Sequence, residues 1–143
     1  MEIFLKALLL ILVGIEAIID IRKKEILLWP LIVMAIIGLL CNLLLSSWSF
    51  KDILSGLIIG VFVAIISIVS HGGIGMGDAV ILMVIGIFLG FEMTLQIFFW
   101  SLVAAAMVAM IYLIRDRKSK GKQIAFIPFI FIGMAGVFIC NVG

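Results

Sequence analysis

Long apolar segments separated by short polar stretches constrain this sequence more than any other feature. A helix that crosses a bilayer needs about 20 mostly apolar residues. Six segments approach this length: 3–20, 27–46, 53–70, 76–90, 92–114 and 124–141. Hydrophobic residues make up 66% of the chain, whereas a water-soluble domain is only about half apolar. The pattern therefore predicts an all-α fold, a polytopic membrane protein that forms a bundle of six transmembrane helices, with one domain over residues 1–143.

The polar part of the chain excludes several classes of protein. No polar stretch exceeds about ten residues, and a soluble domain needs about 50. The net charge of +2 is too small to indicate a nucleic-acid partner. The first segment has neither a basic cluster nor a small-residue cleavage site, so we expect a retained helix rather than a signal peptide. Cys41 and Cys140 lie in apolar segments without CxxC spacing, which favours packing over a metal site.

The distribution of lysine and arginine predicts the orientation in the membrane. Only Lys6 and Lys51 lie on the side opposite to the loops after the first, third and fifth segments. Those loops hold the other eight basic residues, namely Arg22, Lys23, Lys24, Arg115, Arg117, Lys118, Lys120 and Lys122. Cytoplasmic loops are enriched in lysine and arginine. We therefore expect a multi-pass plasma-membrane protein with these loops in the cytoplasm and both termini outside.

Two aspartates come to the same membrane level in this topology. Asp20 ends the first apolar segment, and Asp78 opens the fourth, both on the cytoplasmic side. Ionisable groups at membrane depth are costly and indicate a functional site by default. Two converging carboxylates favour aspartyl proteolysis, in which the pair shares one proton and activates a water. The sequence leaves open which aspartate is the base and which the acid.

Glu16 lies one helical turn before Asp20 and on the same helix face. It is deeper in the apolar segment, so it must face protein or water. Two interpretations stay open. Glu16 is either a neighbour that shares the proton of the two aspartates or a partner for a buried polar group.

A glycine cluster precedes the second aspartate. Four glycines fall between positions 72 and 77. Glycine permits positive φ and close approach of another backbone, so Gly75 and Gly77 are expected to make room for an extended substrate peptide beside Asp78. The alternative is a flexible turn with a capping aspartate. On the first interpretation valine at Gly77 is harmful, whereas alanine at Gly86, inside the next helix, is tolerated.

At these residues the chain resembles the bacterial type IV prepilin peptidase family of membrane aspartic proteases, with its motif of glycine, any residue, glycine and aspartate. Residues 20–26 resemble the segment of the first aspartate, 75–78 match the second, and 127–129 followed by Gly133 resemble the C-terminal motif. The resemblance implies an endopeptidase that cleaves prepilin leaders at the cytoplasmic face, without a cofactor. The implied site has catalytic Asp20 and Asp78, substrate-positioning Gly75, Gly77 and Pro128, and an auxiliary Glu16.

The sequence departs from the family pattern at two places. Ile26-Leu27-Leu28 replaces a common Ile-Pro-Asn, and Val80 replaces a common lysine. Long family members also carry an N-methyltransferase domain with paired CxxC motifs, which we do not expect here. The chain resembles the short, peptidase-only form found with Tad/Flp-type pili and related secretion systems.

Two other functions remain as alternatives. The departures motivate a catalytically impaired factor that binds pilins during assembly. A proton-coupled transporter or small channel would use Glu16, Asp20 and Asp78 as a relay. The outer halves of the segments offer such a relay almost no polar residues. The particular prepilin and the oligomeric state are not indicated by the sequence.

Overall fold

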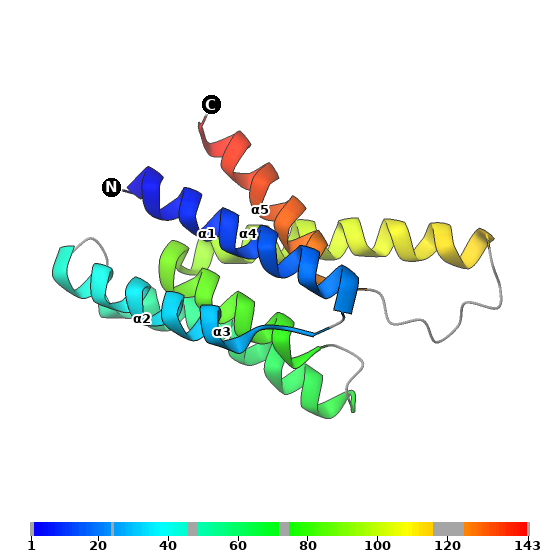
Figure 1. Ribbon diagram of the computed structural model, residues 1–143, viewed down its shortest axis with the longest axis horizontal. Coiled ribbons are helices and arrows are strands. Elements are labelled where there is room, and N and C mark those ends of the chain that lie inside the picture. The colour runs from blue at the N-terminus through cyan, green and yellow to red at the C-terminus, as the bar shows by residue number, and fades with distance from the viewer. Residues whose placement is uncertain (1, 24, 46–48, 72–74, 116–124, 143) are drawn as a thin grey trace.

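The computed structural model describes residues 2–23, 25–45, 49–71, 75–115 and 125–142, and all regular structure within them is helical. The helices are α1 (Glu2–Lys23), α2 (Leu28–Leu45), α3 (Phe50–Val69), α4 (Met76–Arg115) and α5 (Ile127–Val142). Figure 1 shows them side by side in a bundle, with the second half of α4 extending beyond the rest. The predicted all-α class is confirmed for the described part of the chain.

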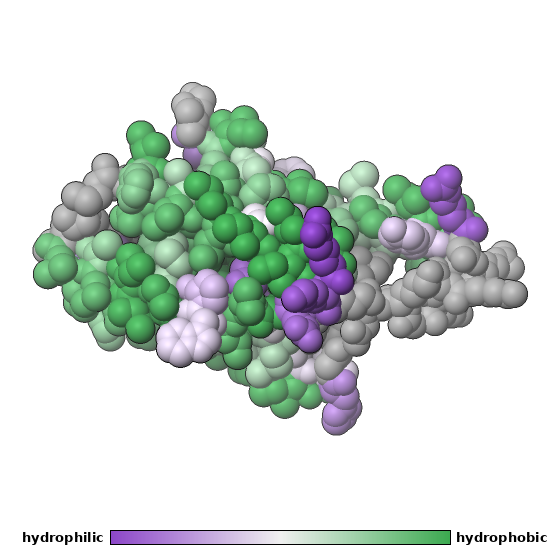
Figure 2. Space-filling model, in the orientation of Figure 1, coloured by the Kyte–Doolittle hydropathy of each residue, from purple (hydrophilic) through white to green (hydrophobic). Residues whose placement is uncertain are grey.

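The helices expose apolar surface. α3 and α4 are long and apolar enough to cross a membrane, and shorter apolar stretches cover Leu28–Leu44 and Ile127–Asn141. Figure 2 shows hydrophobic side chains over most of the visible face, with much of the hydrophilic surface toward the end where α1 stops. Large contiguous apolar surfaces mark sites of membrane or protein contact. The apolar helices therefore favour a membrane protein.

The boundary expected between segments 76–90 and 92–114 is a kink inside α4. Gly90 has φ 74° and ψ −177° there, a backbone region essentially restricted to glycine. Neighbouring side chains satisfy carbonyl groups at the break: the Asn42 amide donates to the Ile87 carbonyl oxygen at 2.8 Å, and the Thr94 hydroxyl donates to that of Gly90 at 2.7 Å. Because unpaired carbonyls are costly in apolar surroundings, these bonds allow α4 to change direction inside the bundle.

The first half of α4 is the centre of the bundle. α4 contacts each of the other four helices, and its first half contributes many of the buried residues. The buried core includes Leu9, Val13, Leu31, Ile81, Leu82, Ile85, Leu89, Ile127 and Ile130. Asp78, at the start of α4, therefore belongs to the helix that contacts all the others.

Glycines bring α3 into direct backbone contact with α4. A Cβ atom added to Gly56 would overlap the Gly86 carbonyl, and one added to Gly86 would overlap the Gly56 carbonyl. Gly60 makes a similar approach to Met83. In a lipid bilayer no hydrophobic force draws helices together, and association depends on close packing, which small residues permit. The expectation that Gly86 accepts alanine is therefore wrong, because this glycine forms a helix contact.

We expect Gly86→Ala to lower the stability of the protein by about 1–3 kcal/mol, the usual cost of overpacking a close contact. Gly136→Ala is the matched control, because an added Cβ at Gly136 meets nothing within 4 Å. Thermal unfolding of the two variants in detergent, followed by circular dichroism, measures the difference. Equal unfolding temperatures for both variants would show that α3 and α4 can move apart at little cost to accommodate the added methyl group.

Candidate active site

The two aspartates predicted as a pair lie on helices α1 and α4. Asp20 is in the last turn of α1 and is 8% exposed, and Asp78 is in the first turn of α4 and is 6% exposed. In Figure 1 the end of α1 and the start of α4 lie toward the same end of the bundle. The charge of Asp20 acts on Asp78. The fold therefore brings together two carboxylates that are far apart in the sequence, and removes both largely from solvent.

Glu16 is the third acid of this cluster. Its side chain is 1% exposed, and the charge of Asp20 also acts on it. Glu16 Oε2 accepts a hydrogen bond of 3.2 Å from the backbone N–H of Leu27, just before α2 begins. The first N–H groups of a helix have no partner within the helix, so a buried acceptor here satisfies a donor at the start of α2. This contact corresponds to the interpretation of Glu16 as a partner for a buried polar group.

In the described part of the glycine cluster, Gly75 is exposed and Gly77 is half-buried. Gly72 and Gly73 lie outside the described residues. The Asp78 N–H donates to the Gly75 carbonyl oxygen at 3.1 Å, and a Cβ added to Gly75 would lie 3.2 Å from Asp78 Oδ2. Gly75 is therefore close to the Asp78 carboxylate, and its role in receiving a substrate peptide stays a prediction.

Gly77 differs from its prediction. It lies in the first turn of α4 and does not have positive φ. A Cβ atom at Gly77 would overlap Cδ1 of Ile26, the side chain that fills this space. The close approach therefore exists, but the group that approaches is Ile26 from the connection between α1 and α2. Sequence reasoning missed this role of Ile26, because nothing in the sequence pairs an apolar loop residue with a particular glycine.

Pro128 is the second residue of α5 and is half-buried. Its position agrees with the usual place of proline in a first helical turn. The N–H groups of Phe129 and Ile130 donate to the Phe126 carbonyl oxygen. α5 packs along α1, where the Phe131 ring lies against Gly14. Figure 1 shows the start of α5 beside the second half of α1, the half that carries Asp20.

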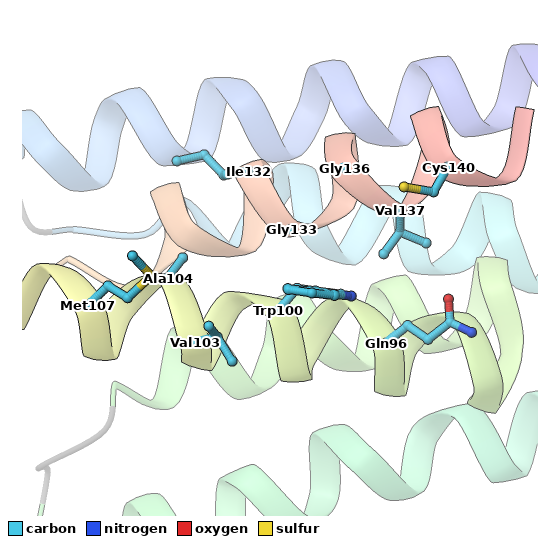
Figure 3. A pocket seen from close by; sticks show the side chains of 10 residues that line it. All are labelled: Gln96, Trp100, Val103, Ala104, Met107, Ile132, Gly133, Gly136, Val137 and Cys140. Carbon is cyan, nitrogen blue, oxygen red and sulfur yellow. The ribbon is translucent and has the colours of Figure 1, made fainter. Parts of the chain in front are cut away.

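A separate apolar groove of about 410 Å³ lies between the second half of α4 and α5, as Figure 3 shows. Its lining consists of Gln96, Trp100, Val103, Ala104, Met107, Ile132, Gly133, Gly136, Val137 and Cys140. These residues include no carboxylate or basic group. The groove therefore holds none of the buried carboxylates, and Asp20 and Asp78 remain the candidate catalytic groups.

The pair Asp20 and Asp78 is suited to proton transfer. Carboxyl groups act as general acids and bases when they are held within reach of a substrate or water. No group of three or more His, Cys, Asp or Glu side chains in the described ranges is placed to hold a metal ion.

The contact between Ile26 and Gly77 predicts a compensating pair of substitutions. Gly77→Ala should lower stability by about 1–3 kcal/mol through overpacking. Adding Ile26→Ala should recover much of that loss, since it removes the Cγ1 and Cδ1 atoms that the new Cβ would meet. Thermal unfolding of the two single variants and the double variant measures this coupling. Simple additivity of the two losses would contradict the contact.

Comparisons with known proteins identify the family of the chain. Residues 7–110 match the model of the type IV leader peptidase family. A segment of 89 residues, 62% of this chain, is 33% identical to the prepilin leader peptidase/N-methyltransferase of Bacillus subtilis (strain 168). That match covers only 36% of the Bacillus protein. No solved structure matches the chain. On the match of the family model, which includes both aspartates and the glycine cluster, the chain belongs to the type IV leader peptidase family.

Proposed function

We propose that this protein is an aspartic endopeptidase that removes the leader peptide of prepilin-like membrane proteins. The observation that carries the proposal is the pair Asp20 and Asp78, both buried, on helices α1 and α4, which contact one another. Membership of the leader peptidase family supports the same chemistry, and the Bacillus relative is named as a prepilin leader peptidase.

In the proposed mechanism Asp20 and Asp78 share one proton. Two neighbouring carboxylates in a site of low polarity cannot both ionise cheaply. The ionised aspartate takes a proton from a water molecule, whose oxygen attacks the scissile carbonyl carbon. The protonated aspartate donates its proton to the carbonyl oxygen. As the carbon–nitrogen bond breaks, the aspartate that took the water proton gives it to the leaving amine, and the other aspartate takes back a proton from the collapsing diol. The two aspartates can exchange these roles, and the reaction needs only a water molecule besides the peptide.

The proposed arrangement in the membrane follows from charge and from the kink in α4. With α4 counted as two spans that meet at Gly90, the helices make six transmembrane segments of one peptidase domain. The lysine and arginine asymmetry supports an orientation with the end of α1 in the cytoplasm and both termini outside. The carboxylates then meet the cytoplasmic junction of a substrate whose apolar helix lies in the bilayer. A short hydrophilic leader ahead of an apolar helix, as in Tad/Flp-type prepilins, fits this geometry.

A catalytically impaired factor that binds pilins is the second candidate. It is favoured by Val80, which packs against the apolar core at a position where the family commonly has lysine. Leu27 stands where the family commonly has proline, which has no backbone N–H, so the hydrogen bond from Leu27 to Glu16 depends on this departure. The binding factor and the peptidase differ in whether the wild-type chain cleaves a prepilin.

Asp20→Asn and Asp78→Asn should each abolish prepilin cleavage, because an amide can neither hold nor transfer the shared proton. Glu92→Gln is the matched control, since Glu92 is an exposed acid on α4 and should be dispensable. The measurement is cleavage of a Tad/Flp-type prepilin in co-expressing membranes at matched enzyme abundance. Cleavage by either asparagine variant near the wild-type rate would remove the aspartyl mechanism, and no cleavage by the wild-type chain would favour the impaired binding factor.

The proposed topology predicts which positions react with a membrane-impermeant thiol reagent. In a chain with Cys41→Ala and Cys140→Ala, Glu25→Cys and Ser119→Cys should be labelled only from the cytoplasmic side. Ser49→Cys should be labelled only from outside, because Lys51 is in the loop of low positive charge. Labelling of intact cells and of inverted vesicles provides the comparison. Labelling of Glu25→Cys from outside would place the aspartates on the wrong side for a leader peptidase.

A further inference from the structure

The carboxylate of Glu16 is buried beside the aspartate pair, yet the proposed mechanism gives it no step. It is 1% exposed on α1, one turn before Asp20. Its Oε2 atom is bonded to the Leu27 N–H. An acceptor is all that this contact requires, and a side-chain amide oxygen can also accept such a bond.

The Leu27 bond ties the connection between α1 and α2 back onto α1. Residues 25–27 are not helical, so no helical hydrogen bonds fix their path. The hydrogen bond from Leu27 to Glu16 holds the last of them against the helix that carries Asp20. Its neighbour Ile26 is thereby held in place.

Ile26 in turn contacts the start of α4. Its side chain lies where a Cβ of Gly77 would be, and Gly77 directly precedes Asp78. The turn around Asp78 is closed by its own N–H bond to the Gly75 carbonyl oxygen. A continuous series of contacts therefore joins Glu16 on α1 to the turn that presents Asp78 on α4.

We infer that Glu16 is a positioning residue for the aspartate pair, an inference that rests on the proposed function. By accepting the Leu27 N–H, it fixes Ile26 against Gly77, and this contact holds Asp78 beside Asp20. Glu16 is not one of the acids that exchange protons with the substrate.

The kinetic test compares Glu16→Gln, which keeps an acceptor oxygen, with Glu16→Met, which removes it at similar length. Ile15→Met, on the exposed face of the same turn, is the control and should match the wild type. Glu16→Met should lower kcat for prepilin cleavage by about 10- to 100-fold with KM unchanged, as expected for misplaced catalytic groups. Glu16→Gln should recover most of the wild-type kcat and keep its pH–rate profile.

Two kinetic results would overturn the inference. A loss of kcat in Glu16→Gln as large as in Glu16→Met would show that the acid proton is needed, and Glu16 would then take part in proton transfer. A Glu16→Met variant with wild-type kcat would show that the contact series does not position the pair.

A second measurement is independent of cleavage. In the full chain with Cys41→Ala and Cys140→Ala, Asp20→Cys and Asp78→Cys are joined with a short thiol-to-thiol cross-linker. The yield should be high when Glu16 is retained, similar with Glu16→Gln and clearly lower with Glu16→Met. An equal yield with Glu16→Met, or no cross-link even with Glu16 retained, would overturn the positioning role. If the wild-type chain cleaves no prepilin, the proposed function fails, while the cross-linking yields still decide whether Glu16 positions the pair.

Discussion

The direct backbone contact between α3 and α4 is the constraint on which the arrangement of the bundle depends. Because Gly56 and Gly86 lack side chains, each helix approaches the carbonyl of the other, and the first half of α4 can lie at the centre of the bundle. In lipid, such close packing replaces the hydrophobic effect as the force that joins helices. The break at Gly90 then lets the rest of α4 leave this centre, with Asn42 and Thr94 bonded to carbonyls near the break.

The candidate site follows from this central position of α4. Its first turn carries Asp78, and α4 contacts α1, on which Asp20 and Glu16 lie one turn apart. Burial strengthens the interaction between charges because the surroundings screen them less than water does. A peptidase gains from this environment, since a shared proton held away from bulk water remains available for the attack on a peptide bond. The connection between α1 and α2 contributes to the same site through Ile26 and through the N–H of Leu27.

The sequence predicted the parts of this protein that depend on composition and on local pattern. Apolar segments of membrane-spanning length predicted the helices, and the all-α class is confirmed over the described residues. The helix boundaries mostly agree, except that residues 76–114 form one kinked helix. The matching motifs around Asp20 and Asp78 predicted the family, which the family model confirms. Wrong predictions concern glycines: Gly86 contacts another backbone, and Gly77 has helical φ and packs on Ile26.

The sequence by itself determined that the chain forms apolar helices, that Asp20 and Asp78 fall at helix ends, and that its basic residues are distributed unevenly among the loops. These properties are set by residue type and by spacing within one segment. Only the tertiary structure decided which backbone meets Gly86 and which side chain fills the space beside Gly77. It also decided from which N–H group Glu16 accepts a hydrogen bond. Each of these contacts joins residues on different elements, and a single sequence contains no local signal for the partner. The physical role of a glycine or a buried acid therefore depends on the neighbour that the fold supplies.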